Sequence, residues 1–373
     1  MHFDCIVVGL GGMGSSTLYH LTQRGQRVCG IEQFGRGHQQ GSSHGEFRVF
    51  RKAYFEHPDY VPLLQEAEHL WRDLEARSGT KLYQRIGVVL SGPANSEAIA
   101  GTRDAAATHD LPIHNLDAAE SRQRWPLLGF RDSDDVVLDQ DAGILAVEEC
   151  VEQHLQLAIE GGATAIFGSP VRSWTADERQ VQVEITSHSL TADRIVFSSG
   201  AWTAPLLNSV LPPMTVLRKA QMWHAVSDGL SSQLAELPAF FFDTSTDTFY
   251  GMPTGNGAIK LARHSRGLVV PDPTHADELS AEEERQAIST FASQRLCGLA
   301  TSPIKVSDCL YTVSPDGHFI VDRHPQLERV CFAAGFSGHG FKFASVIGSV
   351  LADLMSQGGT SLPIDFLGLQ RFR

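Results

Sequence analysis

Three glycines near the amino terminus have the spacing of a phosphate-binding turn. Gly9, Gly11 and Gly14 form a Gly-x-Gly-x-x-Gly motif between an apolar run, residues 3–8, and a segment of helical character, residues 15–24. In such a turn the first glycine allows a sharp bend, the second admits a pyrophosphate to the backbone, and the third lets the helix pack on the strand. The amino terminus of the helix then offers free N–H groups to the phosphates.

An acidic residue completes this pattern. Glu32 ends a second apolar run, residues 27–31, at about the 20-residue distance expected of an acid that accepts hydrogen bonds from ribose hydroxyls. An acid at this position disfavours the 2′-phosphate of NADP, whereas NAD and FAD both remain open. The sequence therefore predicts a dinucleotide-binding site at the start of the chain.

The six cysteines are scattered along the chain without CxxC spacing: Cys5, Cys29, Cys150, Cys297, Cys309 and Cys331. In a chain of 373 residues this pattern indicates neither a disulfide framework nor a zinc site. We expect reduced, mostly buried thiols in a cytoplasmic protein with no bound metal.

One lysine lies in an unusual setting. Lys260 is flanked by apolar residues in the strand-like segment 258–262. A lysine among apolar neighbours is costly unless it is paired or functional. The alternative is that its side chain extends along the strand and reaches water at the edge.

The charge balance restricts the partners. The formal net charge is −13, with 42% hydrophobic and 20% charged residues, as in an ordinary globular protein. Nucleic acid and anionic membranes both favour a basic surface, so neither is expected as a partner. The first residues show no signal peptide, and no apolar run is long enough to cross a membrane.

The predicted elements that position these residues follow two different patterns along the chain. Strand-like runs at 86–90, 163–167 and 194–199 alternate with helical segments at 60–77 and 148–161, which favours a parallel α/β arrangement continuing from the amino terminus. Residues 211–305 hold strand-like pieces without long helices between them, which predicts a mixed, largely antiparallel sheet. A strand, a glycine-rich turn and a helix return after residue 318. We therefore predict a discontinuous nucleotide-binding domain (residues 1–85, 145–210 and 310–373) and a substrate domain (residues 86–144 and 211–309).

Three longer motifs carry a specific resemblance. GSSHGEFRVFR at 41–51, CLYTVSPDGHFIVDRHP at 309–325 and FSGHGFKFAS at 336–345 occur in this order. With the glycine motif they make nearly the whole chain resemble the monomeric sarcosine oxidase and N-methyltryptophan oxidase family. The resemblance implies a Rossmann-like FAD-binding domain of the glutathione-reductase type and a monomer, and it selects FAD over NAD.

The same resemblance implies roles for individual residues. Cys309 matches the cysteine that binds the flavin 8α-methyl group as a thioether, and Arg51 and Lys342 match a clamp for the substrate carboxylate. Lys260 and Arg48 match cations beside the flavin ring, the lysine assisting the reaction with O2. Without the resemblance, Cys309 would be core filler and the cations ordinary surface groups.

Further positions match the pocket and the cofactor site. Pocket residues implied by the resemblance are His44, Tyr250, His264 and Tyr311, and Phe241 stands where sarcosine oxidase has a methionine. Cofactor contacts implied are Ser42, Arg48, Val171, Gly338, Gly340 and Lys342. The leading function is an FAD-dependent oxidase of N-methyl or cyclic secondary amino acids that reduces O2 to H2O2. The alternatives are an FAD dehydrogenase with another electron acceptor, and a non-catalytic flavoprotein.

Overall fold

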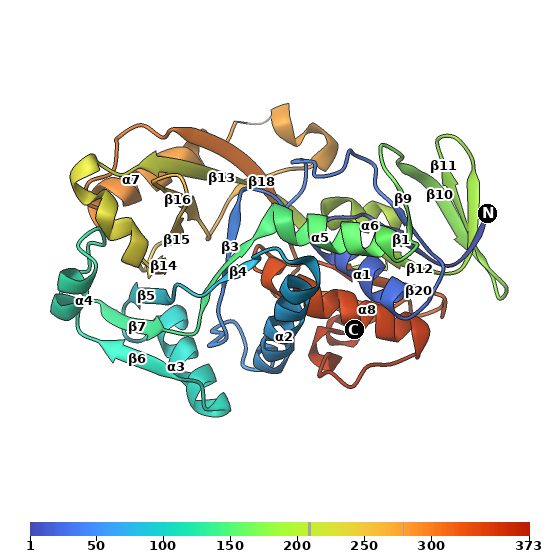
Figure 1. Cartoon of the computed structure of the whole chain (residues 1–373), viewed down its shortest axis with the longest axis horizontal. Coiled ribbons are helices and arrows are strands. Elements are labelled where there is room, and N and C mark those ends of the chain that lie inside the picture. Colours follow the sequence, from blue (N-terminus) through green and yellow to red (C-terminus); the bar gives the residue numbers. More distant parts are fainter. Residues whose placement is uncertain (208–209, 279) are drawn as a thin grey trace.

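The structure is a computed structural model that describes residues 1–207, 210–278 and 280–373. Three sheets and the helices packed on them form an elongated molecule (Figure 1). The helices are α1 (Gly12–Gln23), α2 (Tyr60–Ser78), α3 (Glu97–His109), α4 (Ala118–Arg124), α5 (Val147–Glu160), α6 (Thr203–Leu206), α7 (Glu282–Arg295) and α8 (Ala344–Ser356). Short 3₁₀ turns lie at Gly200–Trp202, Asp228–Glu236, Pro273–Glu278, Phe341–Phe343, Asp365–Leu367 and Leu369–Phe372.

The first sheet carries the glycine turn. Its strands are β1 (His2–Val8), β2 (Val28–Ile31), β9 (Thr164–Ile166), β10 (Val171–Ala176), β11 (Val181–Ile185), β12 (Ser189–Phe197), β19 (Ile320–Arg323) and β20 (Val330–Ala334). The strands β12, β1, β2 and β9 run parallel to one another, and β20 pairs with β12 in parallel, whereas β11 pairs with β12 antiparallel. Three distant stretches of chain therefore build one sheet, as the predicted discontinuous domain requires. The exact division of the chain into domains remains a prediction.

Helix α1 sits close to this sheet because two glycines allow it. A Cβ atom on Gly14 would lie 1.7 Å from the carbonyl oxygen of Gly9, so a side chain there would push the helix off the strand. Gly9 itself has a φ of +88°, in the region that favours glycine. On its other faces α1 packs against α5 and α8 in a continuous apolar core.

The second sheet is mixed and largely antiparallel, as predicted. Its strands are β5 (Val88–Gly92), β6 (Ile113–Leu116), β7 (Asp135–Asp139), β13 (Thr215–Ala225), β14 (Ala239–Asp243), β15 (Thr248–Pro253), β16 (Ala258–Arg263), β17 (Leu268–Val269) and β18 (Lys305–Val313). One detail was wrong: the strand-like run at 86–90 does not continue the parallel arrangement of the first sheet. The strands β5, β7 and β6 pair antiparallel, and β5 joins β14 from the second half of the chain.

A third, small sheet includes part of the 41–51 motif. Strands β3 (Phe47–Phe50), β4 (Tyr83–Gln84) and β8 (Gly143–Ala146) pair antiparallel. Arg48 therefore lies within a strand and Arg51 directly after it. No helix among the residues that the structure describes is long and apolar enough to cross a membrane.

Candidate functional site

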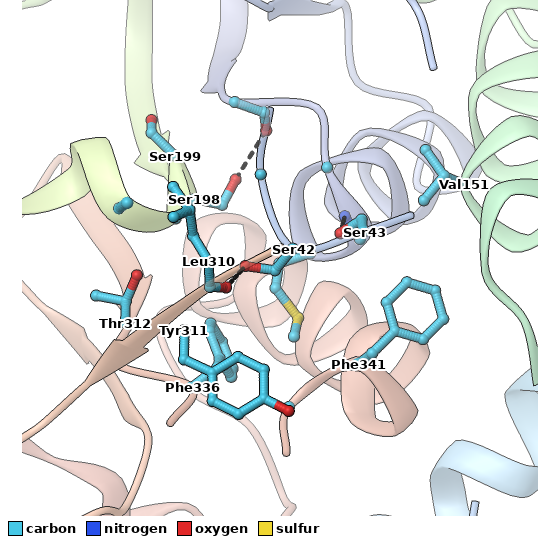
Figure 2. A pocket seen from close by; sticks show the side chains of 18 of the residues that line it. Ser42, Ser43, Val151, Ser198, Ser199, Leu310, Tyr311, Thr312, Phe336 and Phe341 are labelled. Carbon is cyan, nitrogen blue, oxygen red and sulfur yellow. Dashed lines mark hydrogen bonds between the residues drawn. The ribbon is translucent and has the colours of Figure 1, made fainter. Parts of the chain in front are cut away.

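A cavity of about 420 Å³ begins at the glycine turn and extends toward the second sheet (Figure 2). Most of the predicted site residues line it: Gly9, Gly11, Glu32, Ser42, Arg48, Arg51, Val171, Phe241, Tyr250, His264, Tyr311, Gly338, Gly340 and Lys342. Four predicted residues do not reach the cavity surface: Gly14, His44, Lys260 and Cys309. One continuous space thus joins the predicted nucleotide site to the predicted substrate site.

The acid at the nucleotide end is held by backbone amides. The N–H of Leu10 donates to Glu32 Oε2 at 2.8 Å, and the N–H of Phe34 donates to Oε1 at 3.0 Å. Burial alone would raise the pKa of Glu32, but the hydrogen bonds from His38 and from these amides hold that pKa below its ordinary value. The carboxylate is therefore ionised at neutral pH and presents a fixed acceptor to a ribose.

Two serines that the sequence did not single out, Ser43 and Ser198, frame the glycine turn. The N–H of Gly12 donates to Ser43 Oγ at 2.9 Å, and the hydroxyl of Ser198 donates to the carbonyl of Gly9 at 3.0 Å. Ser42, shown with Ser43 in Figure 2, donates to the carbonyl of Leu310. Ser43 and Ser198 adjoin predicted elements, but only the folded chain shows that these two face the cavity.

Two glycines at the opposite wall admit aromatic rings. A Cβ atom on Gly338 would lie 2.1 Å from the ring of Tyr311, and one on Gly340 would lie 2.5 Å from Phe336. Both positions line the cavity. A side chain at either glycine would displace a ring and close space that a flat ligand needs. These features, with the amide-held acid at the other end, fit an extended dinucleotide such as FAD.

A buried ion pair also lines the cavity. Arg51 donates to both carboxylate oxygens of Glu56, at 2.6 and 2.8 Å, and its guanidinium stacks 4.4 Å from the ring centre of Tyr54. Burial would raise the pKa of Glu56, but the charge of Arg51, with His339 and Lys342, lowers it to about 2. Glu56 belongs to no motif, so sequence reasoning missed it.

The second predicted clamp residue lies beside this pair. Lys342 Nζ donates to the backbone carbonyl of His339 at 2.8 Å. Burial, and then the charge of Arg51, lower the pKa of Lys342 to about 7, while Glu56 acts in the opposite direction. A negative group that enters between Arg51 and Lys342 would therefore favour the protonated amine.

The imidazole of His339 is fixed in one tautomer. Its Nε2 lies 3.0 Å from the carbonyl oxygen of Gly317, and its Nδ1 lies 2.6 Å from the hydroxyl of Tyr54. Burial lowers the pKa of His339 to about 4, so the ring is neutral. Only a protonated Nε2 can donate to the carbonyl, hence the hydroxyl of Tyr54 donates to Nδ1.

Aromatic rings form the wall next to the cations. The ring centre of His264 lies 6.0 Å from Phe241, 6.4 Å from Tyr250 and 5.9 Å from Tyr311. Burial lowers the pKa of His264 to about 3 and raises the pKa of both tyrosines. The wall is thus uncharged at neutral pH, which suits the apolar part of a small substrate.

Two predicted residues lie just behind the cavity surface. Lys260 is fully buried, and its Nζ donates to the carbonyls of Gly45 at 2.5 Å and Phe47 at 3.1 Å. Burial, and then the charge of Arg48, lower the pKa of Lys260 well below its ordinary value. Cys309 is buried in β18, directly before the cavity-lining Leu310 and Tyr311.

His44 and Arg48 belong to the same region. His44 is buried, and burial followed by the charge of Arg48 lowers its pKa to about 4. Arg48 lines the cavity and donates to the carbonyls of Phe47 and Ser42, both at 3.0 Å. Two cations, Arg48 and Lys260, therefore share the carbonyl of Phe47.

Known proteins resemble the chain along its whole length. A model of the family "FAD dependent oxidoreductase" matches residues 4–354. The monomeric sarcosine oxidase of Streptomyces avermitilis is 36% identical, covering 99% of this chain and 97% of that protein. The N-methyl-L-tryptophan oxidase of Yersinia pestis is 33% identical and covers 100% of both chains. The solved structure of NikD, an unusual amino acid oxidase essential for nikkomycin biosynthesis, has the same fold, with a TM-score of 0.87 at 23% identity over 98% of this chain and 97% of that one. The family match and these full-length relatives agree with the glycine turn and the amide-held acid. The chain therefore belongs to the FAD-dependent oxidoreductase family that includes monomeric sarcosine oxidase and N-methyl-L-tryptophan oxidase.

Proposed function

We propose that this protein is an FAD-dependent oxidase of secondary amino acids, N-methylated or cyclic, that produces H2O2. The observation that carries the proposal is the pair of buried cations, Arg51 and Lys342, in the same cavity as the dinucleotide turn. Glu56 balances only one of these two cations, and an amino acid substrate supplies a second carboxylate. The two curated relatives are named for oxidation of N-methyl amino acids, which supports the same substrate class.

The cofactor site follows from the cavity wall. Gly9, Gly11 and the start of α1 would hold the pyrophosphate, and Glu32 would accept hydrogen bonds from a ribose. Ser42, Arg48, Val171, Gly338, Gly340 and Lys342 would contact the rest of the molecule. When bound, FAD accepts a hydride equivalent from the substrate and passes two electrons to O2, which with two protons gives H2O2.

The substrate would lie between the cations and the aromatic wall. Arg51 has five N–H donors, and its bonds to Glu56 and Ala53 leave others for a substrate carboxylate. Neutral His264 and the protonated tyrosines Tyr250 and Tyr311 would surround the amine, and Phe241 would contact the carbon skeleton. The amine loses its proton before oxidation, and the resulting imine hydrolyses to a carbonyl compound and an amine.

Two basic residues at or just behind the cavity wall, Arg48 and Lys260, would assist the reaction with O2. A protonated Lys260, together with Arg48, would supply positive charge from a fixed position, and such charge stabilises negative charge as it develops on O2. This arrangement favours the oxidase over a dehydrogenase with another acceptor. We further propose a monomer in the cytoplasm, in keeping with the acidic net charge of −13 and the absence of a disulfide pattern.

An anaerobic bleaching screen tests the proposal. The holoenzyme is mixed under argon with sarcosine, N-methyltryptophan, pipecolate or proline, its absorbance near 450 nm is followed (roughly the oxidised flavin band), and peroxide is measured after air is admitted. Bleaching followed by stoichiometric H2O2 supports the oxidase. Bleaching without peroxide in air would indicate a dehydrogenase, and no bleaching with any secondary amino acid would leave a non-catalytic flavoprotein.

A covalent link to the cofactor is the first specific prediction. We expect Cys309 to bind the FAD through its sulfur, because the residue precedes the cavity-lining Leu310 and Tyr311 on β18. After acid precipitation the wild-type pellet should remain yellow, and Cys309→Ser should release its flavin to the supernatant. Cys331→Ser, a change of another buried cysteine away from the cavity, should keep the yellow pellet. Complete release from the wild type would contradict the linkage.

The lowered pKa of Lys342 predicts proton uptake on substrate binding. In the empty site this pKa is about 7, and a carboxylate beside the amine would raise it. Below pH 7 the amine is already charged, so affinity should vary little; above pH 7 affinity should fall, by up to about tenfold per pH unit. The measurement is the dissociation constant of acetate, followed by the flavin spectrum from pH 6 to 9.

The control for this prediction is Lys342→Met. The neighbouring groups Glu56 and His339 stay in one protonation state across this range, since their pKa values are about 2 and about 4. The variant should therefore bind acetate weakly with no such decline. A flat profile for the wild type would contradict proton uptake by Lys342, and a decline that persists in Lys342→Met would assign the titration to another group.

A further inference from the structure

We propose that Glu148 is a positioning residue for Lys260, acting through the segment Gly45–Phe47. Its carboxylate fixes the backbone whose carbonyls hold the lysine amine. The inference rests on the proposed role of Lys260 in the reaction with O2, and it adds a residue that the family resemblance did not point to. Glu148 lines the cavity from the first turn of α5.

The carboxylate of Glu148 binds two successive backbone amides. The N–H of Gly45 donates to Oε1 at 2.6 Å, and the N–H of Glu46 donates to Oε2 at 3.0 Å and to Oε1 at 3.2 Å. The N–H of Val147, next to Glu148, donates to the carbonyl of Glu46 at 2.8 Å. Groups at the start of α5 therefore bind the peptide groups on both sides of Glu46.

The segment has a backbone conformation that needs such support. Gly45 has a φ of +91° and Glu46 a φ of +68°. The second is costly for a residue with a side chain and persists only where the surroundings impose it. A carboxylate that accepts both amides is a sufficient cause, because charge-assisted hydrogen bonds are the strong ones.

Lys260 depends on the carbonyls of this same segment. Its two hydrogen-bond acceptors, Gly45 and Phe47, flank Glu46 on either side. Within the described residues no carboxylate lies within ion-pair distance of its amine. Glu148 is thus linked to the lysine by one peptide unit, and its negative charge also opposes the effect of Arg48 on the pKa of Lys260.

A matched pair of variants on one helical turn tests the inference. Glu148→Gln removes the charge that holds the segment, whereas Glu149→Gln removes a charge from the neighbouring exposed position at the same helix end. We expect Glu148→Gln holoenzyme to react with O2 at least about tenfold more slowly after anaerobic reduction. FAD content and the rate of reduction by substrate should change less than about twofold, as should every rate of Glu149→Gln.

Two further measurements separate positioning from general damage. In a Lys260→Met background, Glu148→Gln should add no further slowing, because the residue acts through the lysine. Glu148→Asp, which keeps the charge on a shorter side chain, should recover part of the lost rate. A crystal structure of Glu148→Gln should show the lysine amine outside hydrogen-bond distance of at least one of the two carbonyls.

The possible failures are distinguishable. Unchanged distances from the amine to both carbonyls in Glu148→Gln would overturn the positioning role, as would additive slowing in the Lys260→Met background. Displacement of the amine with an unchanged O2 reaction in both Glu148→Gln and Lys260→Met would uphold the positioning and overturn the proposed role of Lys260 itself.

Discussion

Replacing Arg51 with alanine is expected to raise the KM for the amino acid substrate by about 100-fold, at normal FAD content. Arg51 is buried and presents charge-assisted donors to the cavity, and the loss of such a partner to a buried carboxylate costs about 2–5 kcal/mol. The loss acts twice, because the carboxylate of Glu56 would then lie unpaired beside the substrate carboxylate and repel it. Steady-state kinetics with a substrate found in the bleaching screen measure the effect.

Two variants show whether the effect is local. Arg131→Ala removes an exposed arginine far from the cavity lining and should leave KM within about twofold. Adding Glu56→Gln to Arg51→Ala should recover part of the lost affinity, since it removes the unpaired negative charge. An unchanged KM in Arg51→Ala would remove this residue from the substrate site.

The nucleotide end of the site could be predicted from the sequence because its requirements are local. The turn at Gly9, the close packing at Gly14 and the acid at Glu32 each follow from residue type and short spacing. The structure gives each a steric or hydrogen-bonding reason, such as the 1.7 Å between a Cβ on Gly14 and the carbonyl of Gly9. The family resemblance in the three longer motifs is confirmed by the full-length relatives.

Pairing between distant strands could not be predicted in this way. The polar segment 35–51 has little strand character, yet Phe47–Phe50 becomes β3 because β8, nearly a hundred residues later, supplies its hydrogen-bond partners. The strand-like run at 86–90 was expected in a parallel alternation, but the strand that forms there, β5, has β7 and β14 as its neighbours. Periodicity reports which side chains are buried and does not report which strand lies next to which.

Two other acids of the site, Glu56 and Glu148, were beyond sequence reasoning. Glu56 and Glu148 stand in no motif and differ from the other glutamates only by what they contact after folding, namely Arg51 in one case and the amides of Gly45 and Glu46 in the other. The cations were easier to find because their neighbours in the sequence are unusual for a charged residue. Lys260, in particular, is a charge within an apolar strand, and the structure buries it completely.

Lys260→Met should therefore produce the largest change in the reaction with O2. We expect reoxidation of the reduced enzyme to slow by about 100-fold or more, while reduction by substrate changes less than about threefold, since a preorganised charge at a dry site contributes about 10²–10³ to a rate. Methionine fills a similar volume and carries no charge, so packing against Trp223 is largely kept. Stopped-flow absorbance separates the two half-reactions: anaerobic mixing with substrate gives the first, and mixing of reduced enzyme with O2 gives the second.

Trp223 also provides the matched control, because a second lysine contacts the same ring. Lys305 Nζ lies 4.4 Å from the ring centre of Trp223, compared with 5.3 Å for Lys260, but its side chain is half exposed and pairs with Glu46. Lys305→Met should leave both half-reactions within about twofold, because a charge screened by water contributes little. Equal slowing in the two variants would mean that contact with the tryptophan, and not a buried charge, governs the reaction. Unchanged reoxidation in Lys260→Met would show that the charge needed by O2 comes from elsewhere in the site, with Arg48 as the remaining cation on the cavity wall beside it.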